Sequence, residues 1–394
     1  MRNESELNEI NQIAPFWGGR NNNMEYPNDI KPLTGLRFIA ASWLLIYFFW
    51  KRLGLEGAVP DVVAFGYMGV DLFFILSGFV LAHVYGPQVE AKNYSHKGFI
   101  WARLARIYPL HILMLSVMIG LWIVGSKLGF TYDASAFDVS QIPFHIALLQ
   151  AWGFVNSDGW NFPSWSISAE WFAYLTFPIS FYLASKFKNS KIGGLFAVSA
   201  LFVAIYILTA LIGKMELTNM TWEGGILRII PAFMAGVMLW FVGRDIRLGQ
   251  KAAYAGVFAS FLMLFVAMTI FKSPMMIWFT LAAIVFFFAE TSKYENGGIC
   301  SNKVWVYLGE VSFAMYMVHL PVDILTCKGI MKFATAFHEK HHYICFFAGM
   351  TLSLIAAITA HELFEKPVRN FMRTHTPSWI KKGKKSLKPV ENAA

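Results

Sequence analysis

The feature that most constrains this chain is a series of apolar stretches, each about as long as a bilayer is thick. The first covers residues 33–50, LTGLRFIAASWLLIYFFW, and is followed by Lys51 and Arg52. About 18 predominantly apolar residues cross the hydrocarbon core of a bilayer as one helix. Because only helices and closed barrels satisfy their backbone hydrogen bonds in lipid, the pattern predicts a bundle of membrane-spanning helices.

Nine further stretches have the length and composition of spans, which makes about ten in all. They cover residues 62–84, 104–127, 164–185, 193–213, 225–242, 251–271, 274–292, 304–326 and 343–365. Residues 141–153 are too few to span and are predicted to form a re-entrant or interfacial helix. Only 14% of the residues are charged, against about 25% in soluble domains. The expected fold class is therefore an all-α integral membrane protein.

The distribution of charge divides the chain into three regions. Residues 1–30 are a polar lead-in, residues 31–370 form the transmembrane domain, and residues 371–394 are a basic tail. With both termini in the cytoplasm, 24 of the 33 Lys and Arg residues lie inside and 9 outside, as the positive-inside rule requires. The net charge of +9 therefore indicates contact with membrane lipids, and we expect no nucleic-acid partner.

Several polar residues lie in apolar surroundings, where they are costly and mark function. Arg37, one turn inside the first span, needs an anionic partner, a wet cavity or an exit to the interface. Asp71 and Ser77 lie in the second span, and Asp71 requires a donor or a cation. Arg103 and Arg106, at i and i+3, share a helix face that suits a phosphate. Alternatively, these two arginines are topology charges at a helix end.

A second set of polar residues lies near the start of the fourth span and in the ninth. Ser166, Glu170 and Tyr174 recur at i, i+4 and i+8, so they form one stripe on a helix. The stripe is interpreted as a proton-handling group with its neighbours, or as a capping serine cluster with a structural glutamate. Tyr316 and His319 lie at i and i+3, and the histidine is either a packing element or a base.

Five segments, in order, resemble the signatures of the acyltransferase-3 family of integral-membrane O-acyltransferases. They are LTGLRFIAA, GVDLFFILSGF, RLARIYPLH, PSWSISAEWFAY and SFAMYMVH, and the resemblance covers residues 31–369. It implies a protein of the bacterial inner (plasma) membrane that takes an acyl group, commonly acetyl, from cytoplasmic acyl-CoA. The acceptor that it implies is a hydroxyl of an exopolysaccharide, an O-antigen or a lipid-linked glycan. No metal is expected.

The resemblance also implies roles for particular residues. Arg37 matches the first-helix arginine of the family, Arg103 and Arg106 match the pair assigned to coenzyme A, and Glu170 and His319 match further family positions. We therefore expect catalytic roles for position 48, Glu170 and His319. Substrate-binding roles are expected for Arg37, Asp71, Ser77, Arg103, Arg106, Trp165, Ser166, Ser168, Tyr174 and Tyr316.

One position departs from the family pattern. The family has an arginine, ten residues and then a histidine as base or acyl carrier, and here that position is Phe48. A phenylalanine neither takes a proton nor carries an acyl group. The chain is therefore an inactivated variant that holds substrate, a natural pseudoenzyme, or an enzyme in which His319 or Glu170 serves instead. We favour the first, because the other motifs are intact. The alternative function is a non-enzymatic transporter or binding component of glycan export.

Overall fold

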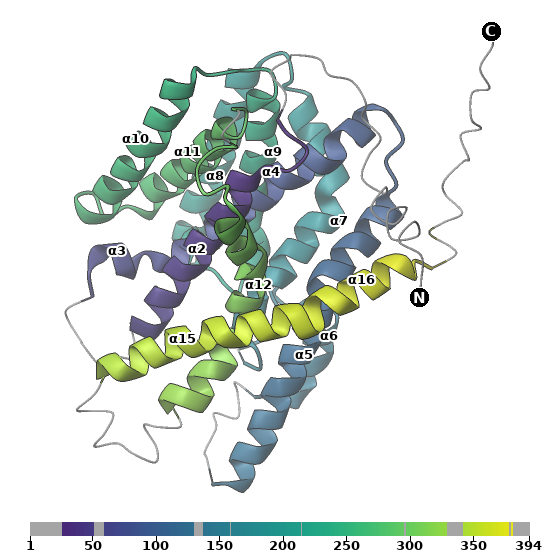
Figure 1. The fold of residues 1–394 in the computed structure, drawn as a ribbon, viewed down its shortest axis with the longest axis vertical. Helices are drawn as coiled ribbons and strands as arrows, with labels where there is room; N and C mark the ends of the chain where they lie inside the picture. Colours follow the sequence, from purple (N-terminus) through teal and green to yellow (C-terminus); the bar gives the residue numbers. More distant parts are fainter. Residues whose placement is uncertain are drawn as a thin grey trace.

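The computed structural model describes residues 26–50, 59–129, 137–157, 159–213, 215–294, 297–328, 342–377 and 380. These residues form helices and no strand, and the helices pack into one bundle (Figure 1). The long helices are α2 (Lys31–Trp50), α4 (Gly69–Glu90), α5 (His96–Lys127), α7 (Trp165–Ser185), α8 (Lys191–Gly213), α9 (Gly225–Gly243), α10 (Gln250–Thr269), α11 (Pro274–Thr291), α12 (Lys303–Asp323) and α15 (His342–Ala360). The predicted all-α membrane fold is confirmed.

Nine helices of the described chain are long and apolar enough to cross a membrane. The tenth expected span forms a helix, α7, which is not among these nine; its polar side chains, such as Glu170, lower its hydropathy. Helix α5 begins at His96, earlier than expected, because the Ser95 side chain accepts a hydrogen bond from the Gly98 N–H (3.3 Å). Helix α15 continues through a π-helical turn, His361–Glu365, into α16 (Lys366–Thr374).

The segment between α5 and α7 is less helical than the sequence predicts. It contains a 3-10 turn at Val139–Gln141 and the short helix α6 (Ile142–Ile146), followed by turns rather than a helix to residue 153. Ser168 of α7 holds these turns, since its hydroxyl donates to the Leu148 carbonyl (2.7 Å) and accepts from the Ala151 N–H (3.0 Å). Leu148 itself has a φ of 59°, which ends regular helix there.

Two glycines bring α4 and α9 into close contact. A Cβ atom on Gly78 would lie 2.1 Å from the Phe233 carbonyl oxygen, and one on Gly236 would lie 2.0 Å from the Ile75 carbonyl oxygen. Small residues at such crossings let two backbones approach within van der Waals distance in a membrane. This contact fixes α4 and α9 relative to each other, and the site described below depends on both helices.

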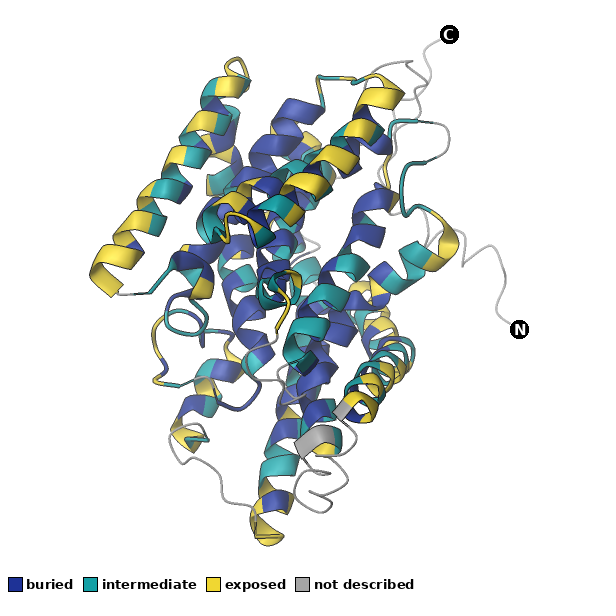
Figure 2. Ribbon diagram, turned by 90° about the vertical axis from the view of Figure 1, so that its left-hand side faces the viewer, coloured by how far each residue is buried: buried dark blue, intermediate teal, exposed yellow. Residues whose placement is uncertain are grey.

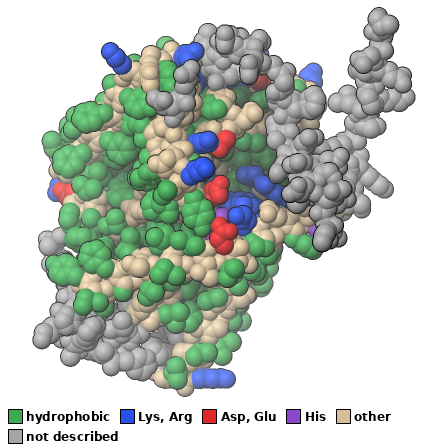
Figure 3. Space-filling model, viewed as in Figure 1, with side chains coloured by type: hydrophobic (Ala, Val, Ile, Leu, Met, Phe, Trp, Pro, Cys, Tyr) green, Lys and Arg blue, Asp and Glu red, His purple; other side chains and the backbone are tan. Residues whose placement is uncertain are grey.

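The outer surface of the bundle is apolar. Figure 2 shows buried residues along the central helices and exposed faces on the outer ones. Large apolar side chains of α8 are exposed, among them Ile192 (85%) and Leu211 (76%). On the face shown in Figure 3 hydrophobic side chains predominate, and charged side chains gather near its middle. Such a surface is stable against lipid acyl chains and costly in water.

A buried polar contact holds the segment before α2 against the end of α11. The Tyr26 hydroxyl donates to Glu290 Oε1 (2.6 Å), which also accepts from Lys293 Nζ (2.7 Å). Lys293 Nζ further donates to the Gly243 carbonyl oxygen (2.6 Å). Burial beside the Glu290 carboxylate raises the pKa of Tyr26 well above its usual value, so its hydroxyl keeps its proton.

Candidate functional site

Two adjacent cavities lie inside the bundle. The first, here called the arginine cavity, has a volume of about 100 Å³. The second, here called the Phe48 cavity, has a volume of about 320 Å³. Val70 and Tyr316 line both cavities, so they lie between them. The polar residues of the arginine cavity are Arg37, Ser77, Arg103, Arg106, Ser166, Glu170, Tyr174 and Tyr316.

Arg106 enters the arginine cavity from α5 and is held by a carboxylate of the π-helical turn. Its NH1 donates to Glu365, whose side chain is 1% exposed. Glu365 also pairs with His361 Nδ1 (2.9 Å) and accepts from Arg369 NH1 (3.4 Å). The widened turn brings Glu365 into contact with Arg106, behind the cavity wall, and this carboxylate is a functional candidate that the sequence reasoning missed.

Arg37 and Arg103 are less fully paired than Arg106. Arg103 NH2 lies 3.5 Å from the Tyr85 hydroxyl, with the guanidinium over that ring. Within the described part of the chain, the buried Nε atoms of Arg37 and Arg103 have no hydrogen-bond partner. Unsatisfied guanidinium donors beside a cavity favour an anionic ligand. The lining of this cavity contains three arginines and one carboxylate, that of Glu170, while Glu365 behind Arg106 is shared with Arg369. The described residues therefore leave a surplus of positive charge at this cavity.

The predicted stripe on α7 does lie along one cavity wall. Ser166, Glu170 and Tyr174 all line the arginine cavity. Glu170 Oε1 accepts from the Ser77 hydroxyl of α4 (2.8 Å), so the structure brings two of the expected residues into contact. The Ser166 hydroxyl donates to the Tyr316 hydroxyl (3.0 Å), which donates to the Pro163 carbonyl oxygen (2.8 Å).

The Phe48 cavity contains the position where the family pattern has a histidine. The rings of Phe48 and His319 lie edge to face with centroids 4.5 Å apart. His319 Nδ1 lies 2.5 Å from the Tyr316 carbonyl oxygen. Because a carbonyl only accepts, Nδ1 carries the proton and Nε2 of the neutral ring carries the lone pair. Nε2 is therefore the ring nitrogen of His319 that would accept a proton if this residue acted as a base.

Asp71 has a cationic partner, as the sequence reasoning expected, but that reasoning did not identify the partner, Arg228. Arg228 of α9 donates from Nε to Asp71 Oδ1 (3.1 Å) and from NH2 to Asp71 Oδ2 (2.5 Å), and both side chains are almost fully buried. Its guanidinium lies over Trp165, 5.2 Å from the ring centroid, and lines the Phe48 cavity. Arg228 is an arginine within a predicted span, so the reasoning applied to Arg37 would have found it.

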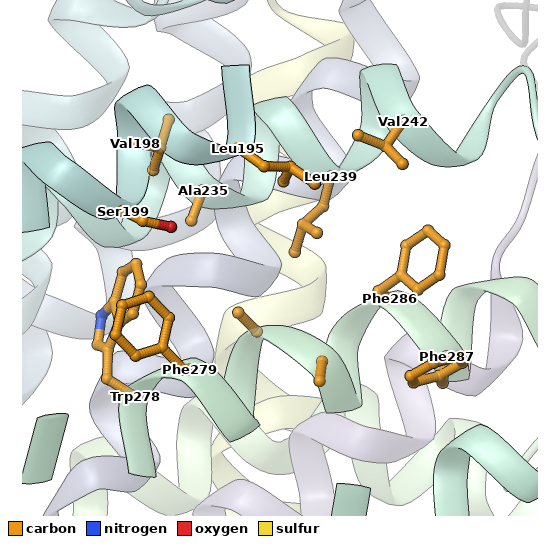
Figure 4. Close-up of a pocket in the computed structure, with 12 residues that line it drawn as sticks. Leu195, Val198, Ser199, Ala235, Leu239, Val242, Trp278, Phe279, Phe286 and Phe287 are labelled. Atoms are coloured by element: carbon orange, nitrogen blue, oxygen red, sulfur yellow. The ribbon is translucent and has the colours of Figure 1, made fainter. Parts of the chain in front are cut away.

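The remaining expected residues divide between the cavities and the scaffold. Trp165 lines the Phe48 cavity, and Ser168 is buried in the hydrogen bonds that hold the turns after α6. A third cavity of about 290 Å³, between α8, α9 and α11, is apolar (Figure 4). Among the described residues, Ser199 and the indole of Trp278 are the polar side chains on its wall, and they do not form a set of groups for acyl transfer.

Comparison with known proteins agrees with the resemblance seen in the sequence. Residues 31–362 match the acyltransferase-3 family model, described as an acyltransferase domain. The chain is 26% identical over 377 residues to acyltransferase MdmB of Streptomyces mycarofaciens. This alignment covers 88% of this chain and 93% of that protein. The chain is also 38% identical over 97 residues to protein 2 in the picA locus of Rhizobium radiobacter. That alignment covers 25% of this chain and 48% of that protein. No solved structure matches the chain.

Proposed function

Because this chain belongs to the acyltransferase-3 family, we propose that it is built to transfer an acyl group from acyl-CoA to a hydroxyl group of a glycan. The observation that carries the proposal is the pair of adjacent cavities, one cationic and one lined by rings, with Tyr316 on the wall of both. An acyl transfer needs a donor and an acceptor held side by side, with the reacting atoms close together.

The arginine cavity is the proposed donor site. Its surplus positive charge and its unsatisfied guanidinium donors suit the phosphates of coenzyme A, which planar guanidinium groups bind with two hydrogen bonds each. A cavity of about 100 Å³ holds only part of such a donor, so the thioester arm would extend toward Tyr316. We place this cavity toward the cytoplasm of a bacterial inner membrane, with both termini on the same side. Acetyl is the acyl group proposed.

The Phe48 cavity is the proposed acceptor site. In a form with histidine at position 48, the imidazole would remove the proton of the sugar hydroxyl as its oxygen attacks the thioester carbonyl carbon. The tetrahedral intermediate would expel the coenzyme A thiolate, which takes the proton back from the imidazolium. With Phe48 the base is missing, and we propose that the chain holds both substrates without turnover. His319, packed on Phe48, is the stand-in base if turnover occurs.

The donor assignment is tested by binding of coenzyme A to purified protein. The variant Arg103→Gln/Arg106→Gln should bind at least ~10-fold more weakly, since each charge-assisted hydrogen bond contributes about 1.5–3 kcal/mol. Arg244→Gln is the matched control, because Arg244 pairs with the exposed Glu90 outside both cavities. Equal binding by the double variant and the control would contradict the donor site and favour a glycan transporter or binding protein.

The assignment of position 48 is tested by turnover. Phe48→His should release coenzyme A from acetyl-CoA in membranes supplied with lipid-linked oligosaccharide and exopolysaccharide, while the Phe48 chain should bind acetyl-CoA without releasing it. Turnover by the Phe48 chain that disappears in His319→Gln would move the base to His319. If well-folded Phe48→His binds acetyl-CoA but shows no turnover with its acceptor, position 48 is not the site of the base.

A further inference from the structure

The walls of the Phe48 cavity combine aromatic faces with a few hydrogen-bonding groups. Its rings come from four parts of the chain, and its other polar groups include the Asn219 amide and the Thr221 hydroxyl. The rings are those of Tyr47, Phe48, Tyr67, Phe162, Trp165 and Tyr316. Flat apolar faces next to separate donors and acceptors suit a sugar ring, whose C–H face packs on aromatic rings while its hydroxyls make hydrogen bonds.

Arg228 is the one arginine or lysine among the described residues of this wall, and its charge is already neutralised. The Asp71 carboxylate receives two hydrogen bonds from Arg228 (2.5 and 3.1 Å). Other N–H groups of Arg228 donate to the carbonyl oxygens of Met220 (3.2 Å) and Tyr67 (3.3 Å). Thr221 in turn donates to Glu223 Oε2 (2.9 Å), which adds negative charge next to the cavity. Among the described residues, this cavity therefore has no surplus positive charge, in contrast to the arginine cavity.

We infer that the Phe48 cavity takes an uncharged sugar residue and that Asp71 sets this preference by neutralising Arg228. Calling the sugar the acyl acceptor rests on the proposed function, whereas the preference itself rests only on the lining of this cavity. A uronic acid would bring a carboxylate that must lose its water and compete with Asp71 for the one guanidinium. The cavity thus discriminates against uronic acids by an unfavourable interaction with their carboxylate, in addition to its favourable contacts with neutral sugars.

The size of the cavity sets a limit on the ligand. Its volume of about 320 Å³ lies at the lower end of the range for small-molecule sites, about 300–1,000 Å³. The site therefore suits one terminal sugar unit or two, with the rest of a glycan outside. Asp71 is then a positioning residue: it contacts Arg228 and acts on the sugar through that guanidinium.

The inference is tested by binding of matched sugars to the full chain in lipid nanodiscs, which avoids sugar-based detergents. The probes are methyl glycosides of glucose, galactose and mannose, each paired with its uronic acid. The unaltered chain should bind at least one neutral sugar about tenfold more tightly than its acid partner. Asp71→Asn leaves the Arg228 guanidinium uncompensated, so this variant should bind the uronic acid of that pair more tightly than the neutral sugar. Glu90→Gln, which removes the exposed carboxylate that pairs with Arg244, should leave the ratio of the neutral-sugar and uronic-acid affinities unchanged.

A double variant keeps the test valid if Asp71→Asn folds poorly. Asp71→Asn/Arg228→Gln has neither charge and should bind the neutral sugar more tightly than its acid partner, as the unaltered chain does. Tighter binding of acids by the unaltered chain, an unchanged ratio in Asp71→Asn, or binding of none of the six sugars would each overturn the inference. Coenzyme A binding is measured in the same samples. Sugar binding without coenzyme A binding would contradict the proposed function and leave the sugar preference standing.

Discussion

Gly236→Ala tests whether the contact between α4 and α9 supports the site. The added Cβ would lie 2.0 Å from the Ile75 carbonyl oxygen and 2.6 Å from the Phe79 nitrogen. Ordinary contact begins near 3.4 Å, so the helices must separate locally by about 1.4 Å. Both obstacles are backbone atoms, which cannot rotate away. The cost therefore lies near the upper end of the ~1–3 kcal/mol typical of overpacking.

The measurement is thermal unfolding in nanodiscs, with Gly120→Ala of α5 as the matched control. No atom of the described residues lies within 4 Å of a Cβ built on Gly120, so that change should be neutral or slightly stabilising. Gly236→Ala should lower the melting temperature by about 3–6 °C, at roughly 1–2 °C per kcal/mol for a chain of this size. It should also weaken sugar binding, because the Asp71–Arg228 pair joins the two helices. Equal melting temperatures for the two variants would refute the reasoning.

Three further predictions concern the arginine cavity, the segment before α2 and the position of the C-terminus. Glu365→Gln should cost about 2–3 kcal/mol of stability, since it breaks the buried pair with Arg106. The same variant should bind coenzyme A several-fold more tightly, because phosphate no longer competes with a carboxylate for Arg106. Weaker coenzyme A binding, measured by calorimetry, would contradict this. Tyr26→Phe should cost about 1–3 kcal/mol. Because the pKa of Tyr26 is raised in the folded chain, its contribution is full below about pH 10 and is lost above it, so melting temperatures of the unaltered chain and Tyr26→Phe should converge in alkali. A fluorescent protein fused to the C-terminus should fluoresce and an alkaline phosphatase fusion should be inactive; the reverse pattern would place the terminus outside.

Local features of the site could be predicted from the sequence, because helix geometry fixes them. The stripe of Ser166, Glu170 and Tyr174 repeats every four positions, so a helix over these residues places all three on one wall. Arg103 and Arg106 share a face for the same reason. The spans could be predicted because lipid admits few alternatives to a helix. The sequence predicts a helix over residues 141–153, but only its first part is helical. Hydrogen bonds with Ser168 of α7 hold Leu148 and Ala151 in turns, and periodicity within the segment does not reveal them.

Pairs between helices could not be predicted from the sequence. Asp71 and Arg228 are 157 positions apart, and Arg106 and Glu365 are 259 apart. No periodicity links positions on different helices, because their rotation about the bundle depends on packing over the whole chain. The charge of each residue indicated that it needed a partner, but the partner's identity follows only from the arrangement of the helices.

The separation of charge between the two cavities explains how position 48 could change without loss of the proposed donor site. Phe48 lies in the Phe48 cavity, against His319, and is not among the residues that line the arginine cavity. Replacing an imidazole by a phenyl ring there removes a base but leaves Arg37, Arg103 and the Arg106–Glu365 pair in place. Donor binding and turnover should therefore respond to different substitutions. A Phe48→His change that altered coenzyme A affinity tenfold would show that the two cavities are coupled and would contradict this separation.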